Sequence, residues 1–256
     1  QPLLDDETLR RLDVLEIDAA PALAEEHHAA DELVRILGVH LEGPFLSRKR
    51  LGTHPPRARR DPDPALLERL LDTGRIRMVT VAPELRGAAG LIGLLLRRGV
   101  TVWLGHTNAT AAEANAAFDA GVRTVTHLFN AMRPFVHRDP GIVGAALARP
   151  DVVVQIILDH IHLAAETAKV VWNAAAGRVA LVTDAVAGAG LNDGSYALGG
   201  VEVKIRDGVA RGPDGMLAGS TLTMIEAVRN LHALGVPLGC ALDAASSVPA
   251  RVIGEH

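Results

Sequence analysis

The chain has 256 residues, of which 48% are hydrophobic, and its formal net charge at pH 7 is -4. This composition predicts a folded domain of enzyme size, and the acidic balance argues against nucleic acid as a partner. A single cysteine, Cys240, excludes an intramolecular disulfide. Its apolar neighbours predict a buried thiol, and we expect a cytoplasmic protein. No apolar run reaches the roughly 18 residues of a membrane-spanning helix, so we expect no membrane partner.

Residues 1–30 have a helical composition and are expected to form a helical lead-in. From residue 36 onward, short apolar or β-branched runs alternate with helical stretches, which is typical of repeated βα units and a parallel sheet. Each run is apolar on both faces, as strands covered by helices require. Six strands are predicted, at Ile36–Leu41, Ile76–Ala82, Val100–Leu104, Arg123–Thr126, Val152–Leu158 and Val179–Thr183.

The segments between the strands carry helix signals. Leucines fall on one stripe of Ala65–Leu71, and either Asn108 or Thr110 can cap a helix that Gly121 ends. Residues 195–219 alternate apolar residues with Gly-Gly and Asp-Gly turns, which predicts a small β-hairpin insertion. A helix over Thr221–Leu234 follows, and its N-terminal amides are expected to be free for an anion.

A polar residue follows each predicted strand: Glu42, Glu84, His106, His127, Asp159 to His162, and Asp184. Intervals of 22, 21, 35 and 22 residues separate Glu84, His106, His127, His162 and Asp184, close to the length of one βα unit. In a barrel of parallel strands these positions collect at the carboxyl-terminal rim, where such folds place their active sites.

One carboxylate and two imidazoles are a sufficient protein ligand set for a catalytic zinc ion, and Glu42, His106 and His127 supply them. A metal-bound water still needs a base, for which Asp184 is the candidate. His162 is expected to face the same cavity, where it can polarise the scissile carbonyl or hold the substrate. His40, two residues before Glu42, points to the same side of its strand and either supports the site or is structural.

A second feature is a basic, Pro-rich loop. It contains Arg48, Lys49, Arg50, Arg57, Arg59 and Arg60. These side chains either attract a small anion or form a solvated face.

Five motifs resemble those of the N-acetylglucosamine-6-phosphate deacetylases of the amidohydrolase superfamily. They are His40-Leu41-Glu42-Gly43-Pro44-Phe45, Gly105-His106-Thr107-Asn108-Ala109-Thr110, Thr126-His127-Leu128-Phe129-Asn130-Ala131-Met132, Val182-Thr183-Asp184-Ala185 and Leu217-Ala218-Gly219-Ser220. Several long motifs in one order are more specific than any single motif, and the resemblance runs from about residue 34 to the end.

The resemblance implies a TIM-type (β/α)8 barrel that removes acetate from N-acetylglucosamine 6-phosphate. It implies one divalent metal ion per subunit, expected to be zinc with iron, cobalt or manganese also suitable, held by Glu42, His106 and His127. Asp184 would be the acid and base, with His162 stabilising the oxyanion. A homodimer is also implied, in which Arg138 can reach the neighbouring subunit's site. The implied substrate-binding residues are Thr53, His54, Asn130, Ala131, Arg138, His162, Leu217, Ala218 and Gly219.

The chain also departs from this pattern. No counterpart of the family's first strand is found, with its His-x-His metal pair, so we expect a single-metal site. The barrel is expected to lack its first two strands and the accessory β-sandwich domain, and residues 1–256 to form one hydrolase barrel.

Two other functions stay open. One is a dihydroorotase-like hydrolase that acts on another amide, although the phosphate-binding residues His54, Asn130 and Arg138 have no use there. The other is a non-catalytic sugar-phosphate binder descended from such an enzyme.

Overall fold

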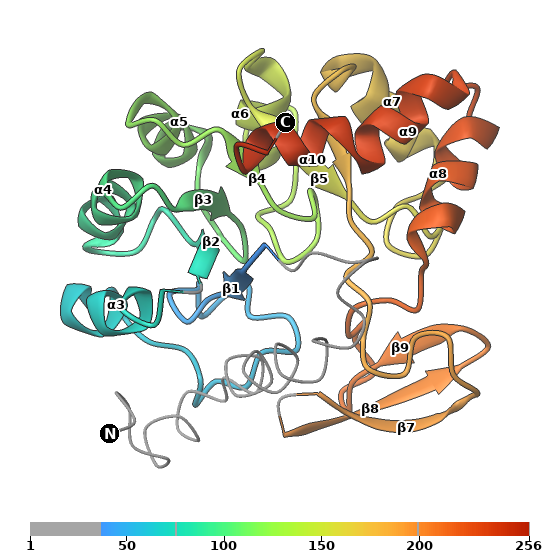
Figure 1. Cartoon of the computed structure of the whole chain (residues 1–256), viewed down its shortest axis with the longest axis horizontal. Coiled ribbons are helices and arrows are strands. Elements are labelled where there is room, and N and C mark those ends of the chain that lie inside the picture. Colours follow the sequence, from blue (N-terminus) through green and yellow to red (C-terminus); the bar gives the residue numbers. More distant parts are fainter. Residues whose placement is uncertain (1–36, 75, 199, 256) are drawn as a thin grey trace.

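The computed structural model describes residues 37–74, 76–198 and 200–255 (Figure 1). The expected lead-in at residues 1–30 lies outside them. The described residues contain a six-stranded parallel sheet in the order β1-β2-β3-β4-β5-β6. Its strands are β1 (Val39–Glu42), β2 (Ile76–Val81), β3 (Thr101–Leu104), β4 (Thr124–Val125), β5 (Val153–Ile156) and β6 (Val179–Leu181). The strands lie in sequence order, and a helix follows each of β1 to β5, so the sheet forms a segment of a TIM-type barrel, as predicted.

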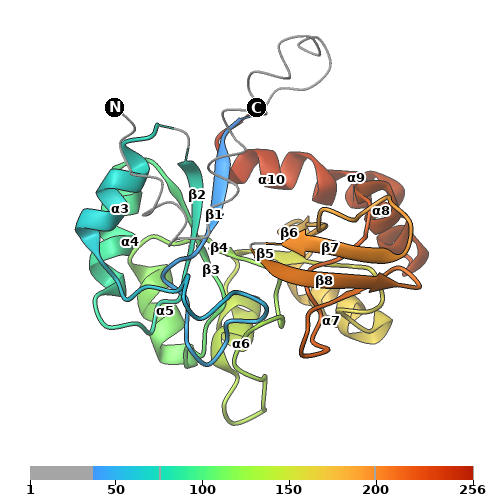
Figure 2. The same ribbon diagram turned by 90° about the horizontal axis from the view of Figure 1, so that it is seen from below.

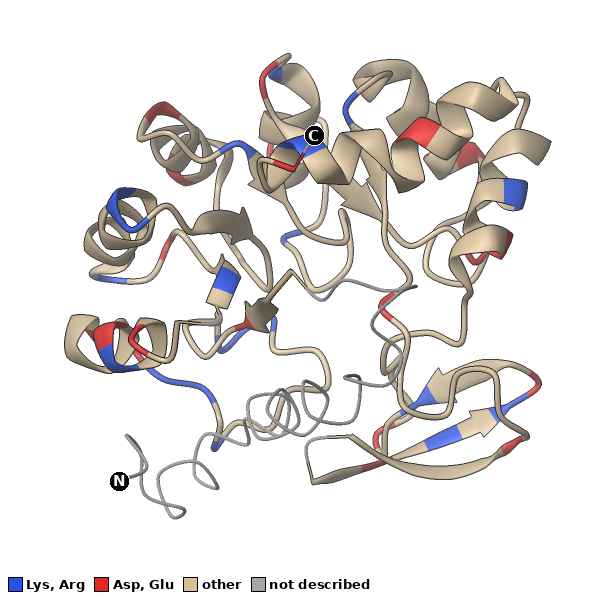
Figure 3. Cartoon of the chain, viewed as in Figure 1, with Lys and Arg blue, Asp and Glu red and all other residues tan. Residues whose placement is uncertain are grey.

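Helices cover the outer face of the sheet, and Figure 1 shows them as an arc around the strands. They are α3 (Pro64–Leu71), α4 (Ala88–Arg97), α5 (Ala111–Asp119), α6 (Gly141–Ala148) and α7 (Ala165–Ala175). The leucine stripe of α3 is buried, as its spacing predicts. Of the two predicted caps for α5, Thr110 is the one used, in a capping box with Glu113. Basic and acidic residues are interspersed along these helices (Figure 3).

The hairpin strands form a second, antiparallel sheet: β7 (Gly194–Leu198), β8 (Val201–Arg206) and β9 (Val209–Arg211). It lies at one end of the molecule in both ribbon views (Figures 1 and 2). A small core of its own includes Val203 and Ile205. The chain then returns beside the end of β6, where Ala185 and Ser220 form a parallel bridge. This bridge brings the Leu217–Ser220 motif next to Asp184.

The predicted helix over Thr221–Leu234 begins later than expected. Helix α8 spans Met224–Ala233, with Thr223 as its N-cap. The Thr223 side chain accepts a hydrogen bond from the Glu226 amide, and the Glu226 carboxylate accepts from the Thr223 amide. A capping box thus uses the amides of Thr223 and Glu226, and an anion at this helix N-terminus stays a prediction.

Two further helices end the chain, α9 (Leu238–Ala245) and α10 (Ser247–Val252). The prediction of a buried Cys240 is wrong, because this thiol is exposed. Helix α9 buries Ala241 and Ala244 against the rest of the protein, and one helical residue corresponds to a turn of about 100°. Cys240 therefore lies off the buried stripe despite its apolar neighbours.

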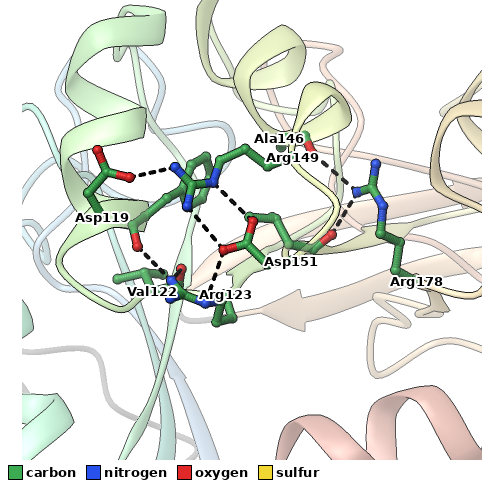
Figure 4. Close-up of polar contacts among 9 residues, drawn as sticks. Asp119, Val122, Arg123, Ala146, Arg149, Asp151 and Arg178 are labelled. Atoms are coloured by element: carbon green, nitrogen blue, oxygen red, sulfur yellow. Dashed lines mark hydrogen bonds and ion pairs between the residues drawn. The ribbon is translucent and has the colours of Figure 1, made fainter.

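An arginine network ties together the amino-terminal ends of β4, β5 and β6 (Figure 4). Arg149 pairs with Asp119 at 2.5 Å and with Asp151 at 3.0 Å, and Arg123 reaches Asp151 at 3.3 Å. Arg178 donates to main-chain carbonyls of the neighbouring helix and strand, including Val152 at 2.7 Å. These contacts stabilise the end of the sheet that lies opposite the predicted site. The polar residues of the predicted site take no part in these contacts.

Gly105 directly follows β3 and lies close to side chains from two neighbouring strands of the sheet. A Cβ atom at this position would lie 2.1 Å from Thr126 Cγ2 and 3.2 Å from Thr80 Cγ2. We expect Gly105→Ala to lower the free energy of unfolding by about 1–3 kcal/mol or more, because overpacking forces neighbours out of place. Urea denaturation measures this change.

Gly90→Ala is the matched control. Gly90 lies within α4, and a Cβ atom there would meet no other atom within 4 Å. Alanine is favoured over glycine in a helix by roughly 0.5–1 kcal/mol, so this variant should be at least as stable as the unaltered protein. Equal stability of the two variants would contradict the packing argument for Gly105.

Candidate metal centre

Glu42, His106 and His127 meet at the carboxyl ends of their strands. Glu42 Oε1 lies 2.9 Å from His127 Nε2 and 3.2 Å from His106 Nε2, and the two Nε2 atoms lie 3.1 Å apart. Within the described ranges, no other group of three or more His, Cys, Asp or Glu side chains gathers its ligand atoms this closely. The structure thus brings together the three residues that the strand spacing predicted as ligands.

The spacing of these atoms suits a metal ion. A tetrahedral ion with bonds of about 2.0–2.1 Å holds its ligand atoms about 3.3–3.4 Å apart. His106 Nδ1 lies 2.9 Å from the Arg50 carbonyl, which can only accept, so Nδ1 carries a proton. A neutral His106 ring therefore points its Nε2 lone pair at the carboxylate and at the other imidazole. Converging acceptor atoms repel one another unless a cation lies between them.

Burial and charge act against each other in this cluster. Burial alone would raise the pKa of Glu42, but the contacts with His106, His127 and His54 lower it well below its usual value. Burial lowers the pKa of His106, opposed by Glu42. Burial would also lower the pKa of His127, but the hydrogen bond and negative charge of Glu42 outweigh it, so the pKa of His127 is raised. An ionised Glu42 beside a neutral His106 is the protonation state that a metal ion needs.

Asp184 follows β6 and lies within electrostatic reach of the three ligands. Burial, followed by the negative charge of Glu42, raises the pKa of its carboxyl group, and His127 and His162 oppose this rise. A raised carboxyl pKa brings the group closer to neutral pH, where a proton can be both taken up and released. Gly219 lies directly against Asp184, since a Cβ there would be 2.7 Å from the Asp184 carbonyl.

Backbone strain is concentrated around this cluster. His106, Ala131 and Asp184 have φ values of 43°, 48° and 50°, in the left-handed region that non-glycine residues rarely adopt. Such conformations cost on the order of 1–3 kcal/mol each and persist where surrounding contacts impose them. They lie in the loops that follow β3, β4 and β6, and such strain is typical of a functional site.

The predicted substrate-binding residues lie at different distances from the three side chains Glu42, His106 and His127, which are called the metal cluster below. His54 Nε2 is 3.6 Å from Glu42 Oε2, and the His54 ring packs edge-on against His106. Ala131 lies beside the same loop, since a Cβ on Gly52 would be 3.9 Å from Ala131 Cβ. Thr53 packs towards the hairpin, 3.4 Å from the Cβ position of Gly212.

Three other predicted site residues differ in their contacts. His162 Nδ1 lies 2.7 Å from Asp159 Oδ2, so the carboxylate accepts from this nitrogen and orients the ring. Asn130 donates to the Leu128 carbonyl at 3.3 Å. Arg138 is exposed, and no hydrogen bond or ion pair within residues 37–74, 76–198 and 200–255 joins it to the cluster. The structure therefore does not bring Arg138 into the site of its own chain.

His40 points to the same side of β1 as Glu42, as the alternation predicts. Its Nε2 lies 2.9 Å from Thr80 Oγ1, and its ring packs near Trp103. Burial lowers the pKa of His40. His40 is thus half-buried, with Thr80 and Trp103 as its neighbours.

Some residues around the metal cluster gave no interpretable signal in the sequence. The Arg50 carbonyl orients His106, and a main-chain acceptor can belong to any residue type. Glu84 was placed in the rim series by its spacing, yet its carboxylate accepts hydrogen bonds from Thr107 and Asn108. It therefore acts on the loop that carries His106 and not on the cluster itself.

A parallel βα sheet that gathers a carboxylate and two imidazoles at its carboxyl edge is typical of metal-dependent TIM-type barrels. The chain belongs to the amidohydrolase family, whose model matches residues 12–256. This family is metal-dependent, and Glu42, His106 and His127 are the possible metal site in this chain.

Among members of this family, the chain is similar to deacetylases of amino-sugar phosphates. The chain is 38% identical over 245 residues to the N-acetylglucosamine-6-phosphate deacetylase of Vibrio furnissii, covering 94% of this chain and 61% of that protein. It is 40% identical over 223 residues to the N-acetylgalactosamine-6-phosphate deacetylase of Escherichia coli O157:H7, covering 86% and 59%. The chain thus spans about three-fifths of the length of these relatives.

Solved structures agree with this result. A mutant N-acetyl-D-glucosamine-6-phosphate deacetylase from Mycobacterium smegmatis, in complex with N-acetyl-D-glucosamine 6-phosphate, matches with a TM-score of 0.85 and 41% identity. The match covers 91% of this chain and 62% of that one.

In the described part of our chain, no helix is long and apolar enough to cross a bilayer.

Proposed function

We propose that the protein hydrolyses the acetamide of N-acetyl-D-glucosamine 6-phosphate to D-glucosamine 6-phosphate and acetate. One observation carries the proposal: Glu42, His106 and His127 converge beside the raised-pKa carboxyl of Asp184, in a chain that resembles such deacetylases over nearly its whole length. A divalent metal, which we propose to be zinc, would be held by the first three residues. When bound, it supplies a Lewis acid that polarises the carbonyl and lowers the pKa of water.

The residues of the chain would move the protons. Asp184 takes a proton from the attacking water and later gives it to the departing amine nitrogen, so one carboxylate serves both steps. The hydrogen bond to Asp159 fixes the orientation of the His162 ring. With Nδ1 donating to Asp159, His162 can also donate from Nε2 only as an imidazolium, and in that form it would stabilise the oxyanion.

The phosphate and sugar would lie between two loops. His54 is close to Glu42, and Ala131 is close to the Gly52 turn, so the 52–54 and 130–131 segments meet at one side of the metal ligands. We propose that Thr53, His54, Asn130 and Ala131 bind the substrate there. Leu217, Ala218 and Gly219 would close the side next to Asp184.

Arg138 would act from a second subunit. It is exposed on a loop that also exposes Phe135 and Val136, with 51% and 47% of their surfaces accessible. Apolar side chains on a projecting loop favour a contact between subunits, and a guanidinium binds phosphate in a fork geometry. We therefore propose a homodimer in which Arg138 completes the neighbouring site. A single cysteine suits a reducing compartment, and we place the reaction in the cytoplasm.

Acetate release tests the proposal. The zinc-loaded protein is expected to release acetate from N-acetylglucosamine 6-phosphate, and the unphosphorylated sugar serves as the matched control, with a kcat/KM at least about 100-fold lower because the phosphate-binding groups are left unpaired. N-acetylgalactosamine 6-phosphate belongs in the same assay, because one relative acts on it by name. Release from neither phosphate would overturn the function, and preference for the second would overturn the choice of sugar.

A further inference from the structure

The orientation of His106 depends on a main-chain carbonyl. His106 Nδ1 lies 2.9 Å from the carbonyl oxygen of Arg50, which belongs to the loop after β1. Because a carbonyl only accepts, this contact keeps the proton on Nδ1 and leaves Nε2 to face Glu42 and His127. A metal-binding histidine usually has its second nitrogen fixed in this way. The orientation of His106 therefore depends on how firmly the Arg50 carbonyl is held.

The Arg50 side chain holds this carbonyl in place, because it forms a hydrogen bond with the loop that carries His106. Arg50 Nε donates to Asn108 Oδ1 at 3.1 Å. The main chain adds a second connection, since the Ser47 amide donates to the His106 carbonyl at 2.9 Å and the Arg50 amide donates to Ser47 at 3.0 Å. The loops after β1 and β3 are thus joined by a side-chain and a main-chain hydrogen bond.

The Asn108 end of this connection is fixed by Glu84, which follows β2. Glu84 Oε1 accepts a hydrogen bond from the main-chain amide of Asn108 at 2.7 Å, and Glu84 Oε2 accepts one from Thr107 Oγ1 at 2.5 Å. Both carboxylate oxygens are therefore used within the residues that directly follow His106. Three consecutive βα loops contribute one residue each, and every contact is within normal hydrogen-bond length.

We propose that Arg50, Asn108 and Glu84 are positioning residues that hold the Arg50 carbonyl against His106 Nδ1 and so keep Nε2 directed at the metal position. This inference rests on the proposed function, because it takes His106 as a metal ligand. It assigns a role to Glu84, which the strand spacing placed on the rim without a task. It also separates Arg50 from the other arginines of its loop, since Arg48 and Arg57 are exposed.

The test compares substitutions that break this connection with ones that keep it. Arg50→Met removes the donor but keeps a long side chain, and Asn108→Ala removes the acceptor. Asn108→Asp keeps an acceptor for Arg50 and should restore the contact. Arg48→Met makes the same change at an exposed position of the same loop and is the matched control. Two readouts are zinc affinity by chelator competition and the exchange rate of the His106 Nδ1 proton in NMR spectra of the zinc-loaded protein.

We expect Arg50→Met and Asn108→Ala each to weaken zinc binding by about 10–100-fold, the usual effect of losing a partner of a metal ligand, and to speed exchange of the Nδ1 proton. Asn108→Asp and Arg48→Met should match the unaltered protein. If Arg50→Met does not fold, the two Asn108 variants decide the question. Unchanged zinc affinity and exchange in both disrupted variants would overturn the positioning role alone, whereas no zinc uptake by the unaltered protein would overturn the metal site as well.

Discussion

Asp184→Asn is expected to lower kcat for acetate release by about 100- to 10,000-fold, which is the usual contribution of a positioned acid and base. Asparagine has nearly the same shape but cannot take a proton from water or give one to the amine. Because Asp184 is not one of the three ligands in the cluster, zinc content should stay near that of the unaltered protein. Single-turnover kinetics and metal analysis on the same sample measure both quantities.

A matched control for this variant is Asp72→Asn. Asp72 is exposed at the end of α3 and pairs with the exposed Arg98, so the change should leave turnover within experimental error. Retention of more than about a tenth of the activity by Asp184→Asn would contradict the acid and base role, which predicts a loss of at least about 100-fold. Loss of zinc together with activity would instead indicate that Asp184 is a ligand.

His127→Ala is expected to remove the metal and, with it, turnover. The His127 ring is buried and its Nε2 lies 2.9 Å from Glu42 and 3.1 Å from His106, so the change removes one of the three converging ligand atoms. Zinc content should fall from about one ion per chain towards zero, since the three protein ligands of a catalytic site are reduced to two. Elemental analysis after dialysis measures the content, and acetate release measures the consequence.

His232→Ala provides the comparison for His127→Ala. His232 is exposed on α8, where its ring contacts only the Val236 carbonyl among the hydrogen bonds of the described chain. This variant should keep both zinc and activity. If His127→Ala kept a full zinc complement, the cluster at the carboxyl edge of the sheet would not be the metal site.

Much of the fold could be predicted because its pattern is local. Each of the six strands is a short apolar run bounded by helix signals, and the observed strands fall inside the predicted ranges except for Glu42 at the end of β1. Capping was harder to predict, because Thr221 and Thr223 both suit the start of a helix. Only the position of Glu226, three residues after Thr223, distinguishes them, through the capping box.

The metal cluster followed from the regular spacing of polar residues at strand ends, because parallel strands place these ends side by side. The supporting contacts could not be predicted in this way. Arg50 acts through a main-chain carbonyl, and Glu84 bonds to a neighbouring loop and not to the cluster, so residue type gives no hint of either. The roles of Asp184, His162 and the substrate-binding residues stay predictions.

The most direct test of the whole account is the location of the metal by anomalous diffraction at the zinc absorption edge from crystals of the zinc-loaded protein. We predict one peak per chain, about 2.0–2.2 Å from an oxygen of Glu42 and from the Nε2 atoms of His106 and His127. A peak bound by other residues, or zinc-loaded crystals with no peak at these three side chains, would contradict the account.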